Sequence, residues 1–402
     1  MGQKSFINYY YFFIVACFTL GSINIGSLPI TIRHLAAIIM FFVCLKVKPM
    51  RLSGTEAVPY IIFICIFGLS CFAYGTYYEY FRLLIAYYLL CFITIWATDI
   101  LINRYNTITP IIKTFVVLGI VDAFSLILQY LNIPGSFEVM RLFNVEDNYM
   151  KYQTLDLSTA DVSYPGIFGA VHGGYNMMVS LICSLYYLYK KDNILSFSIW
   201  LFIMFGLFCT QQRAAFLCGI MASGFFFYKM RLINFRSFRG AVLSVMIFIG
   251  CMFVFLRFRD LSQIFESSRF STMTEIGVRE YIYKTSYLYI SDNLLFANVY
   301  EYQAMYDVWP HNLIFNAFMY GGLFSALAIM YILIRHITFA LKSVLAKLSF
   351  SSVQCCVMGL AFISYNVISM THNLSIVTGD ILYWLLICPI LFTIRKKRNN
   401  YD

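Results

Sequence analysis

The stretch from Ile108 to Leu131 reads ITPIIKTFVVLGIVDAFSLILQYL and holds only two charged side chains, those of Lys113 and Asp122. A helix needs about 20 largely apolar residues to cross a bilayer. The whole chain has this character, because 61% of its 402 residues are apolar, 19% are aromatic and 12% are charged. Soluble domains carry about 25% charged residues. The composition therefore excludes an ordinary soluble domain and predicts an all-α polytopic membrane protein.

Similar apolar stretches recur along the chain. They lie near 7–26, 29–46, 57–75, 81–102, 108–131, 164–189, 194–210, 213–230, 239–257, 312–334, 351–370 and 374–394. They predict about 12 transmembrane helices in a single integral domain, residues 1–402. We expect no cleavable signal peptide, because the first apolar run leads into another without a small-residue cleavage pattern.

Basic residues cluster in alternate connections between these stretches, around Lys46–Arg51, Arg104–Lys113, Lys190–Lys191, Lys229–Arg239, Arg335–Lys347 and Arg395–Arg398. Lys and Arg mark the cytoplasmic side of a membrane protein, so both termini are predicted to be cytoplasmic. The excess of 29 Lys and Arg over 19 Asp and Glu is then a topology signal, and we expect no nucleic acid as a partner.

Two connections assigned to the outside are long, at about 132–162 and 258–311. Long connections commonly carry function. The second contains tyrosines at helical spacing, which predict a partly helical external cap on the membrane face: Tyr281, Tyr283, Tyr287 and Tyr289.

Neither cofactor nor metal motifs occur. We find no phosphate-binding glycine loop, no His-Glu-x-x-His zinc motif and no Gly-rich dinucleotide turn, so we expect no cofactor and a metal-independent activity. The cysteines are expected to be small buried residues, because nearly all lie inside apolar runs and none lies in either long polar connection. They are residues 17, 44, 65, 71, 91, 183, 209, 218, 251, 355, 356 and 388.

Asp122 is the one charge that falls clearly in the middle of a predicted span. An intramembrane carboxylate is a functional candidate by default. A structural role, in which a neighbouring side chain is its partner, is equally open.

The ends of two spans carry polar residues on the predicted outer side. Arg213 begins the eighth span and is followed by small residues that would let this helix pack closely on a neighbour: Ala215, Cys218, Gly219 and Ala222. Such packing would direct Arg213 into the bundle, whereas an arginine that reaches lipid headgroups is the alternative.

The tenth span begins with VWPHNLIFNAFMYGG, residues 308–322. Pro310 suits a first helical turn. Asn312, Asn316 and Tyr320 recur every four residues and would form one polar stripe, which must face protein or water because lipid cannot satisfy it. His311 would sit at the positive end of this helix, which favours a neutral ring able to accept a proton. An ordinary interfacial histidine is the alternative.

Arg279 lies in the long connection at 258–311, as part of IGVRE, residues 276–280. A solvated loop arginine is the simplest interpretation. The topology, however, places Arg213, Arg279 and His311 on the same side of the membrane. Two arginines could hold a pyrophosphate and a histidine could accept the proton of an incoming hydroxyl.

Several motifs together are similar to those of a known family. Thr210-x-x-Arg213-Ala-Ala, the Arg279 stretch leading to Asp292-Asn-Leu-Leu-Phe, and His311-Asn312 with Tyr320-Gly-Gly resemble the bacterial O-antigen polymerase and O-antigen ligase superfamily over about residues 160–335. The stretch Tyr164–Gly174 departs from the family pattern, because Tyr164-Pro165 stands in place of the arginine and Gly173-Gly174 in place of Pro-Asn.

The resemblance implies a lipid-dependent glycosyltransferase in the bacterial inner membrane, with a periplasmic active site that uses an undecaprenyl-pyrophosphate-linked oligosaccharide. Its implied catalytic residues are His311, Arg213 and Arg279. We add substrate-binding roles for the two arginines and for Asn312, Asn316, Tyr320, Arg82 and Asp307. Besides the lipid bilayer, the family analogy names a chain-length regulator protein as a partner.

The two enlarged outer connections favour a polymerase of repeat units over a ligase that transfers polymer to the lipid A core. A polysaccharide flippase would need polar residues at mid-depth in several spans, and the sequence offers little beyond Asp122. A purely structural scaffold would leave His311 and its asparagine stripe without a purpose.

Overall fold

The computed structural model describes residues 5, 8–11, 42, 54–131, 133–138, 164–191, 193–230, 276–349, 352–372 and 374–399. Within these ranges the chain is helical and has no strand, apart from an isolated β-bridge between Asn298 and Tyr320. The elements are α3 (Gly54–Ala73), α4 (Tyr77–Leu83), the π-helical turn η1 (Leu84–Tyr88), α5 (Leu89–Tyr105), α6 (Thr109–Tyr130), α9 (Ala170–Lys191), α10 (Ile194–Cys209), α11 (Arg213–Met230), α14 (Ile276–Asp292), α15 (Val299–Tyr306), α16 (Leu313–Met319), α17 (Leu323–Leu345), α18 (Val353–Ser369) and α19 (Ile381–Asn399).

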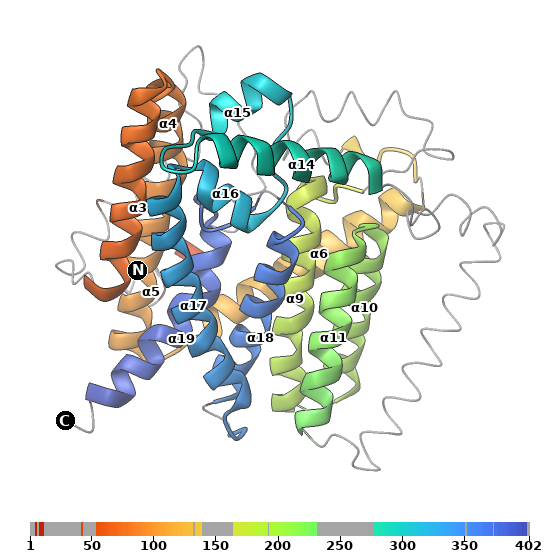
Figure 1. The fold of residues 1–402 in the computed structure, drawn as a ribbon. Helices are drawn as coiled ribbons and strands as arrows, with labels where there is room; N and C mark the ends of the chain where they lie inside the picture. Colours follow the sequence, from red (N-terminus) through yellow and green to blue (C-terminus); the bar gives the residue numbers. More distant parts are fainter. Residues whose placement is uncertain are drawn as a thin grey trace.

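The long helices run side by side, and α14, α15 and α16 lie across one end of the bundle (Figure 1). We call this the capped end. Three helical segments are long and apolar enough to cross a membrane: Tyr77–Tyr105, Thr109–Tyr130 and Leu323–Leu345. Four shorter apolar helices accompany them, at Ala57–Ala73, Ile194–Cys209, Val353–Ser369 and Ile381–Arg395. The chain is therefore a helical protein with the character of a membrane protein, as its composition predicts.

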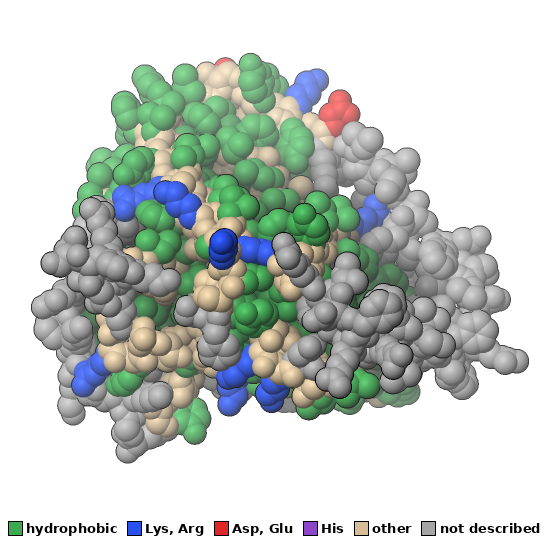
Figure 2. Space-filling view, turned by 90° about the horizontal axis from the view of Figure 1, so that it is seen from below, with side chains coloured by type: hydrophobic (Ala, Val, Ile, Leu, Met, Phe, Trp, Pro, Cys, Tyr) green, Lys and Arg blue, Asp and Glu red, His purple; other side chains and the backbone are tan. Residues whose placement is uncertain are grey.

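The ends of the helices differ in charge. Basic residues stand in the last turn of α5, α9, α11 and α17, whereas the last turns of α3, α6, α10 and α18 have none. Figure 2 looks at the end opposite the capped one and shows Lys and Arg side chains spread over it among hydrophobic ones. The alternation of basic connections in the sequence thus corresponds to one basic end of the bundle.

Three expected spans differ from the structure, and one of them, 164–189, is helical only from Ala170 onward. The stretch 312–334 is broken into α16 and α17 at Gly321 and Gly322, whose φ angles are 126° and 80°. A Cβ atom on Gly322 would collide with the carbonyl group of Leu295, so this close approach requires glycine. The stretch 374–394 becomes helical only at Ile381. The tyrosine hydroxyls of Tyr60 and Tyr88 hold the preceding turn by donating to backbone carbonyls 376 (3.3 Å) and 377 (2.8 Å).

Three expected spans, near 7–26, 29–46 and 239–257, lie almost entirely outside the described residues, as does most of the connection 132–162. The connection 258–311 is described from residue 276 onward and is helical over α14 and α15. The expected helical segment with its tyrosines is therefore present there.

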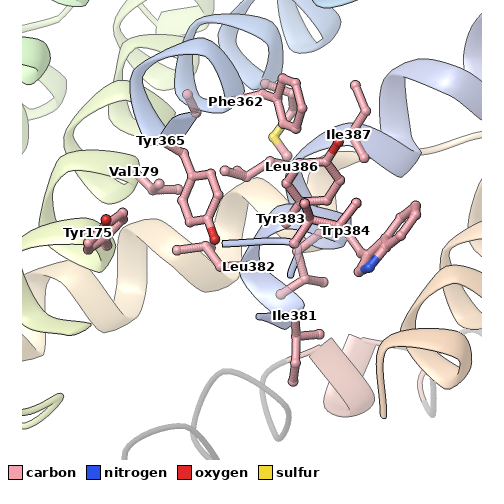
Figure 3. Packing of buried hydrophobic residues seen from close by; sticks show 14 of the residues in the cluster. Tyr175, Val179, Phe362, Tyr365, Ile381, Leu382, Tyr383, Trp384, Leu386 and Ile387 are labelled. Carbon is pink, nitrogen blue, oxygen red and sulfur yellow. The ribbon is translucent and has the colours of Figure 1, made fainter. Parts of the chain in front are cut away.

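Aromatic residues fill the core between α9, α18 and α19. Figure 3 shows Tyr175, Tyr365, Tyr383 and Trp384 among buried aliphatic side chains. The ring centroids of Tyr175 and Tyr365 lie 5.3 Å apart, and those of Tyr383 and Trp384 lie 5.3 Å apart. Aromatic pairs at this spacing contribute about 0.5–1.5 kcal/mol each beyond the area that they bury. The first pair packs α9 against α18, and the second lies within α19.

Candidate functional site at the capped end

Asn298 attaches the cap to the bundle. Its side-chain oxygen accepts hydrogen bonds from the backbone N–H groups of Tyr300 (3.0 Å) and Glu301 (3.2 Å), which begins α15. Its Nδ2 donates to Thr76 Oγ1 at 3.1 Å and to Ser70 Oγ at 3.3 Å. Thr76 is the N-cap of α4, and Ser70 lies in the last turn of α3. One buried amide therefore both starts a cap helix and ties it to the membrane helices.

His311 lies at the start of α16, partly buried. Asn312 is the N-cap of this helix, because its side chain accepts hydrogen bonds from the N–H groups of Ile314 and Phe315. Pro310 thus stands before the helix and not in its first turn as expected. Since α16 has only seven residues, its dipole at His311 is smaller than that of the long helix expected from the sequence.

The predicted polar stripe divides into two parts. Asn312 Nδ2 donates to the carbonyl oxygen of Met370 at 3.0 Å, which brings this side of α16 to the connection between α18 and α19. Asn316 is buried, and neither atom of its side-chain amide has a hydrogen-bond partner in the described part of the chain. Tyr320 ends α16 and packs on α3, with its ring centroid 4.6 Å from that of Phe67.

Arg213 is the first residue of α11 and is partly buried. The predicted close packing of this helix is confirmed at Ala215, Gly219 and Ala222, which are buried. A Cβ atom on Gly219 would stand 3.0 Å from a methyl group of Leu181 on α9. Cys218 is only partly buried.

The turn before Arg213 is unusual. Gln211 has a φ of 59°, a conformation that costs a non-glycine residue free energy and that is concentrated at functional sites. Its side chain is buried, and neither amide atom has a hydrogen-bond partner among the described residues. Gln212 touches α9 so closely that a Cβ atom on Gly174 would collide with its side chain.

Tyr175 on α9 contacts the connection between α18 and α19 close to the residue that accepts from Asn312. Tyr175, next to Gly174, contacts the ring of His372 with 5.9 Å between centroids. His372 stands two residues after Met370, the partner of Asn312. The turn of Arg213 thus contacts α9 next to the residue that contacts His372, and Asn312 contacts Met370 in the same connection, residues 370–380.

The other predicted site residues are spread over the cap. Arg279 lies in the first turn of α14, and its side chain is outside the described residues. α14 itself packs on α16, where the rings of Tyr283 and Phe315 are 5.7 Å apart. Asp307 ends α15 in a left-handed conformation, with a φ of 54°, and is exposed.

Arg82 is exposed on α4. Burial raises the pKa of the nearby Tyr300 hydroxyl, and the Arg82 guanidinium acts in the opposite direction. Arg82 therefore lies within electrostatic reach of Tyr300 on α15.

Asp122 has a structural partner. Its Oδ1 accepts a hydrogen bond of 2.7 Å from the backbone N–H of Ile167, in the turn that leads into α9. Gln129, two turns further along α6, accepts from the N–H of Gly166 at 2.9 Å. The bond at Oδ1 is the structural partner that one of the two roles predicts, whereas the buried Oδ2 has no hydrogen-bond partner among the described residues.

Sequence reasoning missed three residues. Gln211 lies two residues before Arg213 and was not predicted as a site residue, because nothing in the sequence indicates its left-handed conformation. His372 lies in the connection that follows the eleventh expected span, where the topology already placed residues 371–373 on the outer side, whereas Ser375 falls inside the expected span 374–394. That position was the available signal for His372.

Among the described residues, no three His, Cys, Asp or Glu side chains lie close enough together to hold a metal ion. No protein-family model matches this chain, and no curated protein matches it either. The assignment of a function therefore depends on the residues at the capped end.

Proposed function

We propose that the protein is a polymerase that joins undecaprenyl-pyrophosphate-linked oligosaccharide repeat units at the outer face of the bacterial inner membrane. The proposal includes about 12 spans, cytoplasmic termini and a periplasmic capped end. The basic end of the bundle supports this orientation, because Lys and Arg are retained in the cytoplasm. The resemblance of the Arg213 and His311 motifs to the O-antigen polymerase and ligase superfamily supports the reaction.

One observation carries the proposal: the turn that holds Arg213 contacts α9 at Gly174, and the next α9 residue, Tyr175, contacts His372 in the connection 370–380. The turn that holds His311 contacts the same connection through the hydrogen bond from Asn312 to Met370. These turns are about 100 residues apart in the sequence. An arginine and a histidine at the same end of a membrane bundle suit a lipid pyrophosphate and a sugar hydroxyl.

The reaction balances without a nucleotide. An acceptor hydroxyl attacks the anomeric carbon of the donor chain, its proton passes to the His311 imidazole, and the bond from that carbon to the pyrophosphate oxygen breaks. Arg213 and Arg279 stabilise the negative charge on the departing undecaprenyl pyrophosphate. Placed cations of this kind commonly supply the largest part of the rate enhancement. The proton then leaves His311 for water.

The test replaces Arg213, Arg279 and His311 singly by alanine in a strain that lacks the chromosomal copy. We expect each variant to reach the membrane at the level of the wild type and to give no surface polymer. Arg104→Ala is the matched control, because Arg104 is an exposed arginine at the far end of the segment Tyr77–Tyr105. Normal polymer in all three variants would exclude the site.

The deletion strain itself separates the reactions. A single repeat unit on the lipid A core identifies a polymerase. Polymer that accumulates on the carrier lipid beside bare core identifies a ligase, and absence of repeat units from the outer face identifies a flippase. Either of the last two patterns would refute the proposal.

A further inference from the structure

The linker between α14 and α15, residues 293–297, lies against the start of α17. The carbonyl oxygen of Leu294 accepts a hydrogen bond of 2.8 Å from the N–H of Leu323, the first residue of that helix. The carbonyl group of Leu295 lies where a Cβ atom on Gly322 would collide with it. The backbone of the linker therefore contacts the end of a helix that is long and apolar enough to cross a membrane.

The same linker is attached to the end of α3. Tyr74, directly after that helix, donates from its hydroxyl group to the carbonyl oxygen of Phe296 at 3.0 Å. Ser70, in the last turn of α3, donates to the carbonyl oxygen of Ala297 at 2.6 Å. The hydrogen bonds to α17 and α3 hold the linker from both sides, so its carbonyl groups 294, 296 and 297 all have partners in the bundle.

The side chains of the linker are apolar and yet uncovered by the protein. Leu294, Leu295 and Phe296 are 45%, 61% and 41% exposed. Single exposed apolar residues are common on proteins, whereas a contiguous apolar patch marks a surface that contacts a partner or a membrane. Three consecutive apolar side chains on a fixed backbone form such a patch.

Exposed apolar side chains continue from the linker onto the helices that hold it. On α17, Phe324 and Leu327 are 57% and 58% exposed, in a segment whose length and composition suit a membrane span. Beside the end of α3, Phe72 and Tyr77 are exposed, and their rings stack with centroids 6.0 Å apart. Tyrosines gather at the boundary between bilayer and water. The linker therefore lies where the lipid-facing surface of α17 begins.

The cap also has a side of different character. Lys284, Tyr287 and Ser291 on α14 are all exposed, and their spacing of three and four residues places them on one side of that helix. Ser291 Oγ donates to the carbonyl oxygen of Tyr287 at 2.6 Å. A side that carries a charge and hydroxyl groups suits water, in contrast to the linker.

We propose that the linker 293–297 inserts into the bilayer leaflet at the capped end, where Leu294, Leu295 and Phe296 contact the acyl chains of phospholipids. Irregular backbone is tolerated beside lipid when its polar groups have partners in the protein, as three carbonyl groups of the linker do. The inserted linker holds the cap to the membrane surface beside α3 and α17. This inference needs α17 to span the membrane and does not depend on the proposed reaction.

The test uses a photoreactive side chain in the full-length protein. Leu295→p-benzoylphenylalanine is irradiated in intact host membranes, where the benzophenone attacks nearby C–H bonds, and mass spectrometry of the purified protein then detects added phospholipid. Tyr287→p-benzoylphenylalanine is the matched control, because Tyr287 is 67% exposed and Leu295 is 61% exposed. Leu327→p-benzoylphenylalanine, on the lipid-facing side of α17, is the positive control.

We expect phospholipid adducts at positions 295 and 327, and about tenfold fewer at position 287, because an apolar side chain is more stable among acyl chains than in water. Adducts at 327 without any at 295 would overturn the proposal, and a cross-link from 295 to another protein would replace lipid by a protein partner. Equal yields at 295 and 287 would also overturn it. Absence of adducts at 327 would remove the span on which the proposal depends.

Discussion

Replacement of Asn298 by alanine should loosen the whole cap. The amide makes contacts in two directions at once: it accepts from the N–H groups of Tyr300 and Glu301, and it donates toward Thr76 and Ser70. Alanine removes all of them and leaves the buried Ser70 hydroxyl and the partly buried Thr76 hydroxyl with one partner fewer each. The effect should therefore appear where the cap meets α3.

The magnitude follows from these contacts. Loss of an N-cap costs about 1 kcal/mol, and each of the two lost side-chain hydrogen bonds costs about 1 kcal/mol. The free energy needed to lift the cap should then fall by about 3 kcal/mol, which raises the fraction of open molecules about 100-fold.

Cys71 reports this opening directly. It is fully buried, and its Sγ lies 3.5 Å from Asn298 Nδ2. We expect a thiol reagent, with the site mapped by mass spectrometry, to label Cys71 about 100-fold faster in Asn298→Ala than in the wild type. Asn298→Asp keeps the acceptor for the helix start and should lie between them. Asn193→Ala removes a simpler N-cap, on α10, and is the control.

Unchanged labelling of Cys71 in Asn298→Ala, relative to Asn193→Ala, would refute the reasoning. It would mean that other contacts hold α15 against α3 without this amide.

Three further predictions concern stability in detergent, measured as melting temperature, and the second of them also concerns surface polymer. Gly322→Ala should lower it strongly because the new Cβ meets the Leu295 carbonyl, whereas Gly224→Ala in α11, where nothing lies within 4 Å, should raise it slightly; equal shifts would contradict the account of the helix break. Asp122→Asn keeps the acceptor for the Ile167 N–H and should keep surface polymer, while Asp122→Leu should destabilise by about 1–3 kcal/mol; loss of polymer in Asp122→Asn would restore a functional role. Gln211→Gly relieves the left-handed backbone and should raise the melting temperature; a fall would show that the amide contributes to folding.

The sequence predicted those parts of the fold that depend on local pattern. α11 begins at Arg213 and ends at Met230, at the expected bounds, because an apolar run between polar turns decides both ends. The break between α16 and α17 was not predictable in this way. Gly321 and Gly322 are tolerated inside a helix, and the collision that requires them comes from Leu295, a contact that only the folded chain creates.

The candidate site, like the fold, could be predicted only where local sequence pattern decides the structure. The end of the bundle at which Arg213 and His311 lie follows from counting spans. The contacts of Tyr175 with His372 and of Asn312 with Met370 do not, because they arise from tertiary packing of α9 and α16 on the connection after α18. The unpaired amide of Asn316 is likewise visible only once its surroundings are known.

The most direct measurement of the central claim uses purified protein with lipid-linked repeat units as the only substrate, and follows product length by gel together with released undecaprenyl pyrophosphate. The account predicts that the wild type extends the chain and releases one undecaprenyl pyrophosphate per linkage formed, without added nucleotide, and that His311→Ala does neither. Chain extension by His311→Ala at the rate of the wild type, or no extension by either protein, would contradict it.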